Sequence, residues 1–123
     1  GFDRLIDNIV LSSPLAKLPV VGYENHAGRT KLGVGVKPFG KVVSQVGHGN
    51  DDTSGADGVL YRNCIGTYLH GPLLGKNPEI ADHLIAVALQ RKLGLDAPME
   101  LASLDDSVEK AANAYMAQRL GVS

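Results

Sequence analysis

The sequence of 123 residues has little cysteine and no tryptophan, and its one cysteine is Cys64. A single cysteine cannot form an intramolecular disulfide, and it cannot supply the paired CxxC ligands of a structural zinc site. A domain of this length buries roughly 65% of the surface of its unfolded chain, so it needs neither a disulfide nor a structural metal to fold. We therefore expect one globular domain in a reducing compartment, the cytoplasm.

Charge of one sign and long apolar runs are also missing. Twelve Lys and Arg stand against thirteen Asp and Glu, whereas a protein that binds nucleic acid by neutralising phosphates usually has a basic surplus. No apolar run approaches the ~20 residues of a membrane-spanning helix. The first residues, GFDRLIDN, lack the basic start and apolar core of a signal peptide. Neither nucleic acid nor membrane insertion is expected.

Sequence motifs for metals, phosphates and an activated serine are absent as well. The four histidines, His26, His48, His70 and His83, never pair at the spacing of a helical metal site such as HExxH. Neither GxGxxG nor GxxxxGK[ST] occurs, and there is no GxSxG elbow. The sequence predicts no metal site and no cofactor.

Glycine, in contrast, is abundant, with 15 residues concentrated in the first three quarters of the chain. That region predicts short strands separated by turns: 6–11, 19–23, a hairpin of 34–36 with 41–46, then 59–61 and 64–69. The last of these is apolar on both parities, as a strand covered on both faces would be. The polar segment 47–58 predicts a mobile surface loop.

The last third predicts two helices. Asn77, Pro78 and Glu79 form a helix start, and Gly94 supplies the stop. The predicted inner positions are Ile80, Leu84, Val87, Ala88 and Arg91 in this helix, and Val108, Ala111, Ala112, Tyr115 and Met116 in one that begins near Ser103. Strands followed by helices indicate an α+β domain in isolation, or one edge of a larger α/β sheet.

His70 is the candidate for acid–base chemistry. It follows the strand CIGTYL and precedes Gly71 and Pro72, so its ring should emerge at the strand end, where ligands collect in open α/β sheets. An imidazole there can act as a general base or acid near neutral pH. The alternative is a histidine that caps the sheet edge through hydrogen bonds.

Cys64 is the only cysteine that could serve as a nucleophile, and its spacing from His70 argues against that role. Six residues of extended chain place the two α-carbons about 20 Å apart, beyond the ~3 Å reach between a nucleophile and its base. Cys64 is therefore predicted to be a core residue, and the chain contains a base without its nucleophile.

A second unusual segment is GYENHAGRT, residues 22–30, directly after the strand PVV. It gathers an acid, an amide, an imidazole and a guanidinium between glycines. Such a turn can contact a polar small molecule or hold a buried hydrogen-bond network, and equally it can satisfy its own backbone as a polar turn.

The segment GYENHAGRT, followed about forty residues later by GTYLHGPLLGKNPEIADHLI, resembles the C-terminal half of cobyric-acid-synthase-like class I glutamine amidotransferases. The ENHAGRT form favours the cell-wall branch of that family, which amidates the glutamate of lipid II in peptidoglycan synthesis, over the cobalamin branch. The resemblance implies a flavodoxin-like α/β fold when complete, with residues 1–123 as the C-terminal portion. It also implies glutamine as substrate and, as partner, an ATP-dependent Mur-ligase-like synthetase.

The resemblance further implies that His70 activates a cysteine located in the N-terminal half, upstream of this chain, so that the 123 residues alone would be inactive. Pro72 stands where many class I glutaminases carry a glutamate that orients the histidine. Arg4 matches an arginine near the glutamine site, and Glu24, Asn25 and His26 are expected to be site-proximal or structural.

Two other hypotheses remain open. The chain can be a glutaminase domain for cobyrinic or cobyric acid amidation, or a non-catalytic module that binds a partner through its helical segment from Ser103 onward. An uncovered sheet edge in such a fragment would favour self-association.

Overall fold

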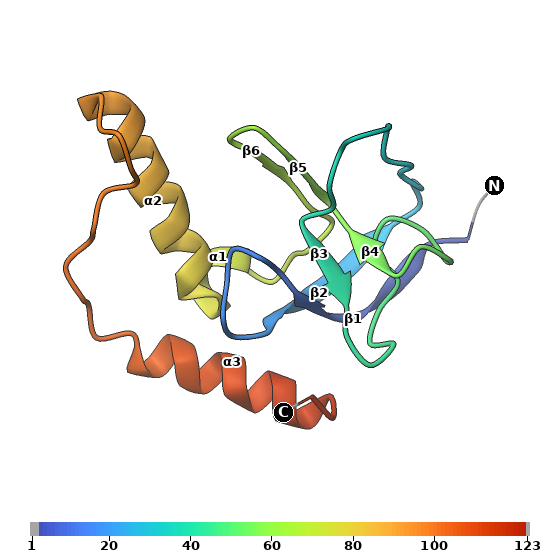
Figure 1. Ribbon diagram of the computed structural model, residues 1–123. Coiled ribbons are helices and arrows are strands. Elements are labelled where there is room, and N and C mark those ends of the chain that lie inside the picture. The colour runs from blue at the N-terminus through green and yellow to red at the C-terminus, as the bar shows by residue number, and fades with distance from the viewer. Residues whose placement is uncertain (1–2, 123) are drawn as a thin grey trace.

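The computed structural model describes residues 3–122, which form a mixed α/β domain with antiparallel sheets (Figure 1). A four-stranded sheet has the order β2-β1-β3-β4, and a separate two-stranded sheet pairs β5 with β6. The elements are β1 (Leu5–Ser12), β2 (Val20–His26), β3 (Gly40–Val42), β4 (Ala56–Asp57), β5 (Val59–Tyr61), β6 (Cys64–Gly66), α1 (Leu73–Lys76), α2 (Pro78–Leu93) and α3 (Ser107–Arg119).

The long β1–β2 ribbon is the centre of the fold. The strands pair antiparallel from Leu5 opposite His26 to Leu11 opposite Val20. One buried cluster gathers Ile9, Leu11, Val20, Phe39, Leu69 and Ile80, and a second gathers Val10, Val21, Ala117 and Val122. Consecutive strand residues enter different clusters because successive side chains point to opposite faces. The start of α2 therefore covers one face of the ribbon, and α3 covers the other (Figure 1).

The predicted hairpin over 34–46 is wrong. Residues 34–35 form a turn in which Val34 is exposed and Gly35 has φ of 78°. β3 has three residues, pairs with β1 and β4 instead, and is followed by Ser44 and Gln45 at φ of 52° and 60°. Left-handed backbone at two consecutive residues interrupts a strand. For this reason β3 ends at Val42 and does not extend through the predicted strand residues 43–46.

The predicted covered strand over 64–69 is also wrong, and so is the assignment of Cys64 to the core. β6 ends at Gly66, and Cys64 is exposed, next to a hairpin turn where Arg62 has φ of 55°. The reason is that the β5–β6 hairpin forms its own two-stranded sheet outside the four-stranded one, so only part of its surface meets the rest of the domain.

The helix predicted after Asn77 is confirmed, with α2 running from Pro78 to Leu93 and Gly94 in the left-handed cap conformation at φ of 64°. Its predicted inner face is mostly wrong, since the buried residues of α2 are Pro78 and Ile80. The Asn77 side chain makes no cap hydrogen bond; it bonds the backbone N–H and C=O of Val21 instead.

The second helix begins at Ser107, later than predicted, and its predicted inner face is confirmed only in part. Met116 packs against the second cluster, but the buried residues are Asn113 and Ala117, whereas Val108 and Tyr115 are exposed. The Asn113 amide donates to the carbonyls of Pro19 and Lys76, so a polar side chain fixes the helix to the sheet. Within residues 3–122, no helix combines the length and apolar character that crossing a bilayer requires.

Candidate functional site

His70 lies at the outer edge of β2 and is exposed. It forms an isolated antiparallel bridge with Tyr23. The His70 N–H donates to the Tyr23 carbonyl at 2.7 Å, and the Tyr23 N–H donates to the His70 carbonyl at 3.2 Å. The two rings are stacked, with centroids 5.4 Å apart. The imidazole that the sequence singles out thus stands directly against the segment 22–30.

The sequence-predicted residues Arg4 and Asn25 lie on the same side of β2 as this ring pair. Tyr23 and Asn25 alternate along the strand as its exposed positions. Arg4 donates from Nε to the Asn25 Oδ1 at 2.9 Å and from a terminal nitrogen to the Asn25 carbonyl at 3.2 Å. We call Arg4, Tyr23, Asn25 and His70 the open face of β2. It combines an imidazole with a guanidinium, two groups suited to acid–base chemistry and to carboxylate binding.

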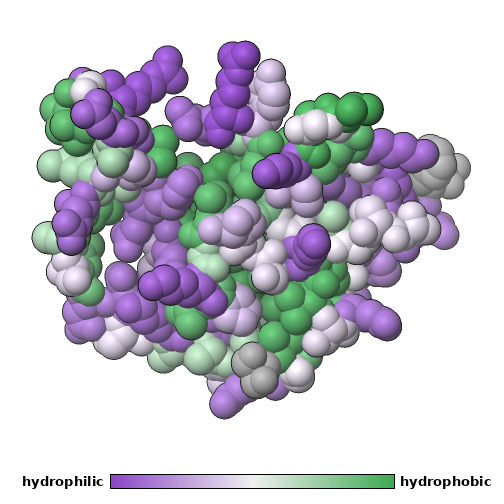
Figure 2. Space-filling view, in the orientation of Figure 1, coloured by the Kyte–Doolittle hydropathy of each residue, from purple (hydrophilic) through white to green (hydrophobic). Residues whose placement is uncertain are grey.

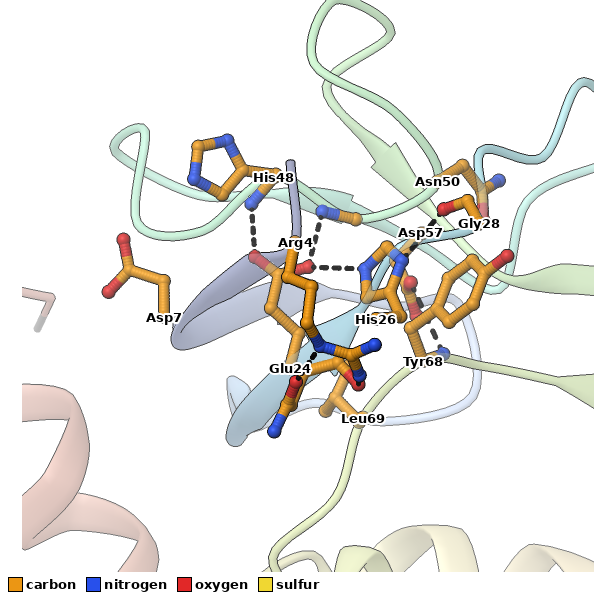
Figure 3. Close-up of polar contacts among 12 residues, drawn as sticks. Arg4, Asp7, Glu24, His26, Gly28, His48, Asn50, Asp57, Tyr68 and Leu69 are labelled. Carbon is orange, nitrogen blue, oxygen red and sulfur yellow. Dashed lines mark hydrogen bonds and ion pairs between the residues drawn. The ribbon is translucent and has the colours of Figure 1, made fainter. Parts of the chain in front are cut away.

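Glu24 and His26 point to the other side of β2 and are buried. The Glu24 carboxylate accepts the backbone N–H of His48 at 2.6 Å and that of Gly49 at 2.9 Å, and it lies 3.1 Å from the His26 Nε2 (Figure 3). The His26 Nδ1 donates to the Gly28 carbonyl at 2.8 Å. Since a carbonyl only accepts, Nδ1 is the donor of this bond.

Tyr68 joins this buried group to the segment that carries His70. Its ring stacks on His26 with centroids 3.7 Å apart and an interplanar angle of 9°. The Tyr68 and Thr30 hydroxyls share a hydrogen bond of 2.7 Å. Tyr68 precedes His70 by two residues, so the stack restrains the backbone from which the His70 ring projects.

Asp57 completes the buried group, and we call Glu24, His26, Asp57 and Tyr68 the sealed cluster. Asp57 accepts hydrogen bonds from the Thr67 hydroxyl and from the Tyr68 N–H. Burial raises the pKa of Asp57, the charge of Glu24 raises it further, and the two hydrogen bonds oppose them. Among the described residues, no buried side-chain nitrogen or oxygen lacks a hydrogen-bond partner.

The segment 47–58 is therefore more than the mobile surface loop that the sequence predicts. Asn50 is buried, donates to the Gly58 carbonyl at 3.0 Å and accepts its N–H at 2.7 Å. Gly49 has φ of 77°, and a Cβ there would lie 2.4 Å from the Ala56 carbonyl oxygen. Polar composition suggested exposure, but these polar groups bond to one another and to Glu24, which allows them to be buried.

Cys64 is not part of the open face, because it lies in the separate β5–β6 sheet. A groove of about 410 Å³ runs between that hairpin and α2, and its lining includes Ile65, His83 and Val87 but none of the predicted site residues. Figure 2 shows hydrophobic side chains at the surface in this region. No cluster of three potential metal-binding side chains occurs over residues 3–122.

The sequence interpretation missed four residues that shape the site: Tyr23, Asn50, Asp57 and Tyr68. One signal could have identified Tyr23, which alternates with Glu24 along a strand, because residues of opposite parity point to opposite faces. No local pattern marks Asn50, Asp57 or Tyr68.

Residues 2–78 match the model of the CobB/CobQ-like glutamine amidotransferase domain. The lipid II isoglutaminyl synthase (glutamine-hydrolyzing) subunit GatD of Staphylococcus aureus is 39% identical over 117 residues, which are 95% of this chain and 45% of the relative. The same subunit of Streptococcus pneumoniae is 42% identical over 104 residues, 85% of this chain and 38% of the relative. Cobyric acid synthase of Pelotomaculum thermopropionicum is 41% identical over 88 residues, 69% of this chain and 15% of the relative.

The chain thus spans less than half the length of these relatives. The family model covers more than half of the chain, including β1, β2 and the segment through His70. This chain belongs to the CobB/CobQ-like glutamine amidotransferase domain family.

Proposed function

We propose that this domain is the C-terminal portion of a glutaminase, which hydrolyses glutamine to glutamate and ammonia, with His70 as the general base and acid. The observation that carries the proposal is the exposed His70 imidazole, which stacks on Tyr23 on the same face of β2 where Asn25 binds Arg4. A catalytic imidazole must lie within hydrogen-bond reach of its reaction partner, whereas both ring nitrogens of His26 already bond to Gly28 and Glu24.

In this mechanism the nucleophile is a cysteine in the part of the protein that precedes β1. His70 takes the thiol proton, and the thiolate sulfur bonds to the amide carbon of glutamine to give a tetrahedral intermediate. His70 then gives the proton to the departing nitrogen, so that ammonia leaves and a thioester remains. In the second half His70 takes a proton from water, whose oxygen bonds to the thioester carbon, and returns it to the thiolate as glutamate leaves.

Arg4 is the group on the open face suited to hold the α-carboxylate of glutamine. A guanidinium binds a carboxylate through two parallel N–H bonds, which fixes orientation as well as position. Asn25 supports this role, because it accepts hydrogen bonds from two nitrogens of Arg4 and so holds the guanidinium plane.

We assign the complete domain a flavodoxin-like fold in which the sheet seen here meets the strands of the N-terminal half. The outer edge of β2 supports this arrangement. Among the described residues β2 pairs along its length with β1 alone, and its other edge is bridged at one position, Tyr23 with His70. An edge with free backbone groups accepts a further strand or a neighbouring segment.

The acceptor that we favour is the glutamate of lipid II, with ammonia passed to an ATP-dependent, Mur-ligase-like partner subunit in the cytoplasm. Support comes from the relatives named as subunits of lipid II isoglutaminyl synthase, which match 85% or more of this chain. The alternative acceptor is cobyrinic or cobyric acid, supported by the cobyric acid synthase that matches 69%. A complete protein that amidates lipid II with a Mur-ligase-like partner, and no corrinoid, would establish the first.

The non-catalytic alternative has its own observation. Leu104, just before α3, and Val108 and Tyr115, within it, are at least 61% exposed, and another protein could pack on this surface. Full glutaminase activity in the complete protein would reject a purely docking role.

The test is His70→Ala in the complete protein, with His83→Ala, a partly buried histidine of α2, as the matched control. We expect His70→Ala to lower glutamate release at least ~10³-fold, the usual cost of losing a catalytic base, and His83→Ala to stay within about 2-fold of the wild type. The 123-residue chain alone should release no ammonia. Retained activity in His70→Ala, or turnover by the chain alone, would contradict the assignment.

A further inference from the structure

We infer that Tyr23 is the positioning residue for the His70 imidazole, an inference that rests on the proposed function of His70. Tyr23 contacts His70 through both its backbone and its side chain. The two N–H to carbonyl bonds, of 2.7 and 3.2 Å, fix the backbone at the point from which the imidazole projects. The stacked phenol ring, 5.4 Å away between centroids at an interplanar angle of 28°, covers one face of the imidazole.

The backbone around this pair is built for close approach. A Cβ on Gly22 would lie 2.5 Å from the His70 carbonyl oxygen, so only glycine allows the His70 backbone to come this near to β2. Gly71 has φ of 122°, and a Cβ there would lie 3.2 Å from the Tyr23 ring. The glycines on either side therefore let the tyrosine and the histidine meet.

The position of Tyr23 is fixed by contacts on the buried face of β2. Glu24, the next residue, is fully buried and accepts two backbone N–H groups from the segment 47–58. Tyr68, on the chain that leads into His70, stacks on His26 of the same strand. Both partners of the Tyr23–His70 pair are thus anchored to the sealed cluster, and the ring pair above it has little freedom to shift.

The stack has one consequence for proton transfer. It blocks rotation of the imidazole toward β2, which leaves the opposite ring face and the ring nitrogens for the nucleophile and the substrate. Tyr23 is 48% exposed, so its removal should affect positioning more than folding.

The test compares Tyr23→Leu and Tyr23→Phe with Tyr61→Leu in the complete, active protein. Tyr61 is 53% exposed on β5 and is the matched control. Stacked aromatic pairs contribute enough to predict a decrease in kcat of about 3- to 10-fold for Tyr23→Leu, with KM for glutamine within about 2-fold. Tyr23→Phe keeps the ring and should recover kcat to within about 2-fold of the wild type, while Tyr61→Leu should leave both constants unchanged.

A second measurement does not depend on turnover. With histidine rings labelled for NMR, the wild type should show an NOE between the Tyr23 and His70 rings and a ring-current shift of the His70 protons that Tyr23→Leu removes. Absence of that NOE, or a kcat in Tyr23→Leu within about 2-fold of the wild type while His70→Ala is inactive, would overturn the role of Tyr23 and leave the proposed function standing. Activity in His70→Ala would overturn both.

Discussion

Neighbouring residues of β2 point to opposite faces of the strand, and the two faces treat polar side chains differently. On the open face Tyr23 and Asn25 are exposed, and they contact His70 and Arg4. On the other face Glu24 and His26 are buried, and their side chains bond to each other and to the backbone of Gly28, His48 and Gly49. One strand therefore exposes the candidate site residues Tyr23 and Asn25 and buries the residues that alternate with them.

This difference predicts that substitutions on the buried face lower the stability of the fold, whereas substitutions on the open face change activity with little effect on stability. A buried charged group that loses its partners destabilises the fold, because desolvation is no longer offset. An exposed group that loses its partner remains solvated, and the cost is small. The predictions below, taken from the largest expected effect on the free energy of unfolding to the smallest, test that separation.

Glu24→Ala should have the largest effect. It removes the acceptor for the backbone N–H groups of His48 and Gly49 and for the ring of His26. We expect a loss of about 3–5 kcal/mol in the free energy of unfolding, the range for breaking a buried pair, measured by urea denaturation. Asn25→Ala, on the open face of the same strand, is the control and should lose less than about 1 kcal/mol. Equal losses would erase the distinction between the faces.

Gly22→Ala should come next. Its Cβ would meet the His70 carbonyl oxygen and the Leu69 side chain, so the strand and the His70 segment must separate. Overpacking of this kind costs about 1–3 kcal/mol, and in the complete enzyme activity should fall with it because His70 moves. Gly33→Ala, whose Cβ would have 4.0 Å to its nearest neighbour, serves as the control. A stable and fully active Gly22→Ala would show that the close approach is not required.

Asp57 provides a test by pH. Burial holds the pKa of Asp57 above its ordinary value of 3.8, so the folded protein retains this proton after the unfolded chain has lost it. The contribution of Asp57 to the free energy of unfolding therefore falls as pH rises from its pKa in the unfolded chain to its pKa in the folded protein. Asp57→Asn does not titrate, so its stability relative to the wild type should increase across that window, by about 1.4 kcal/mol for each unit of pKa elevation.

Asp51 is the internal control for that experiment, since its effect has the opposite sign. Backbone hydrogen bonds from Thr53 and Ser54 hold the pKa of Asp51 below its ordinary value. Its contribution is present above the unfolded pKa and is lost as pH falls through the folded one, so Asp51→Asn should lose stability relative to the wild type as pH rises through that lower window. Parallel stability curves for the wild type and Asp57→Asn would contradict the burial of a titrating carboxyl.

Arg4→Ala should have the smallest effect on stability, within about 0.5 kcal/mol, because Arg4 and Asn25 are both exposed. In the complete enzyme the same variant should raise KM for glutamine more than it lowers kcat, since it removes binding rather than chemistry. A large loss of stability with an unchanged KM would assign Arg4 to the fold instead of to the substrate.

The sequence predicted the fold best where local signals were strong. The helix signals around Pro78 and Gly94 located α2, and the segment 6–11, which ends in Ile9, Val10 and Leu11, located β1. It failed where partners far along the chain decided the outcome. The run 41–46 reads as a strand, but β3 ends at Val42 and left-handed residues follow. Val108 and Tyr115 have helical spacing, yet Asn113 and Ala117 face the sheet, because the contact is made through the Asn113 amide.

The candidate site was predicted only in part, because some of its residues have local sequence signals and others depend on partners in other segments. Its place after a predicted strand singled out His70, the resemblance added Arg4, and parity along β2 could have separated Tyr23 from Glu24. The burial of Asp57 and Asn50 could not be predicted, because it depends on pairing between β4 and β3 and on bonds from a polar loop to its own backbone. Such long-range satisfaction of polar groups leaves no periodic signal in the sequence.

The most direct measurement compares His70→Ala with His26→Ala in the complete enzyme, with glutamate release and unfolding followed on the same samples. If the two faces of β2 divide chemistry from structure, His70→Ala will lose turnover at least ~10³-fold at unchanged stability. His26→Ala will unfold more easily but will keep its turnover within about 10-fold while folded. A folded but inactive His26→Ala together with an active His70→Ala would place the chemistry on the buried face of β2 and contradict the assignment of His70 as the catalytic base.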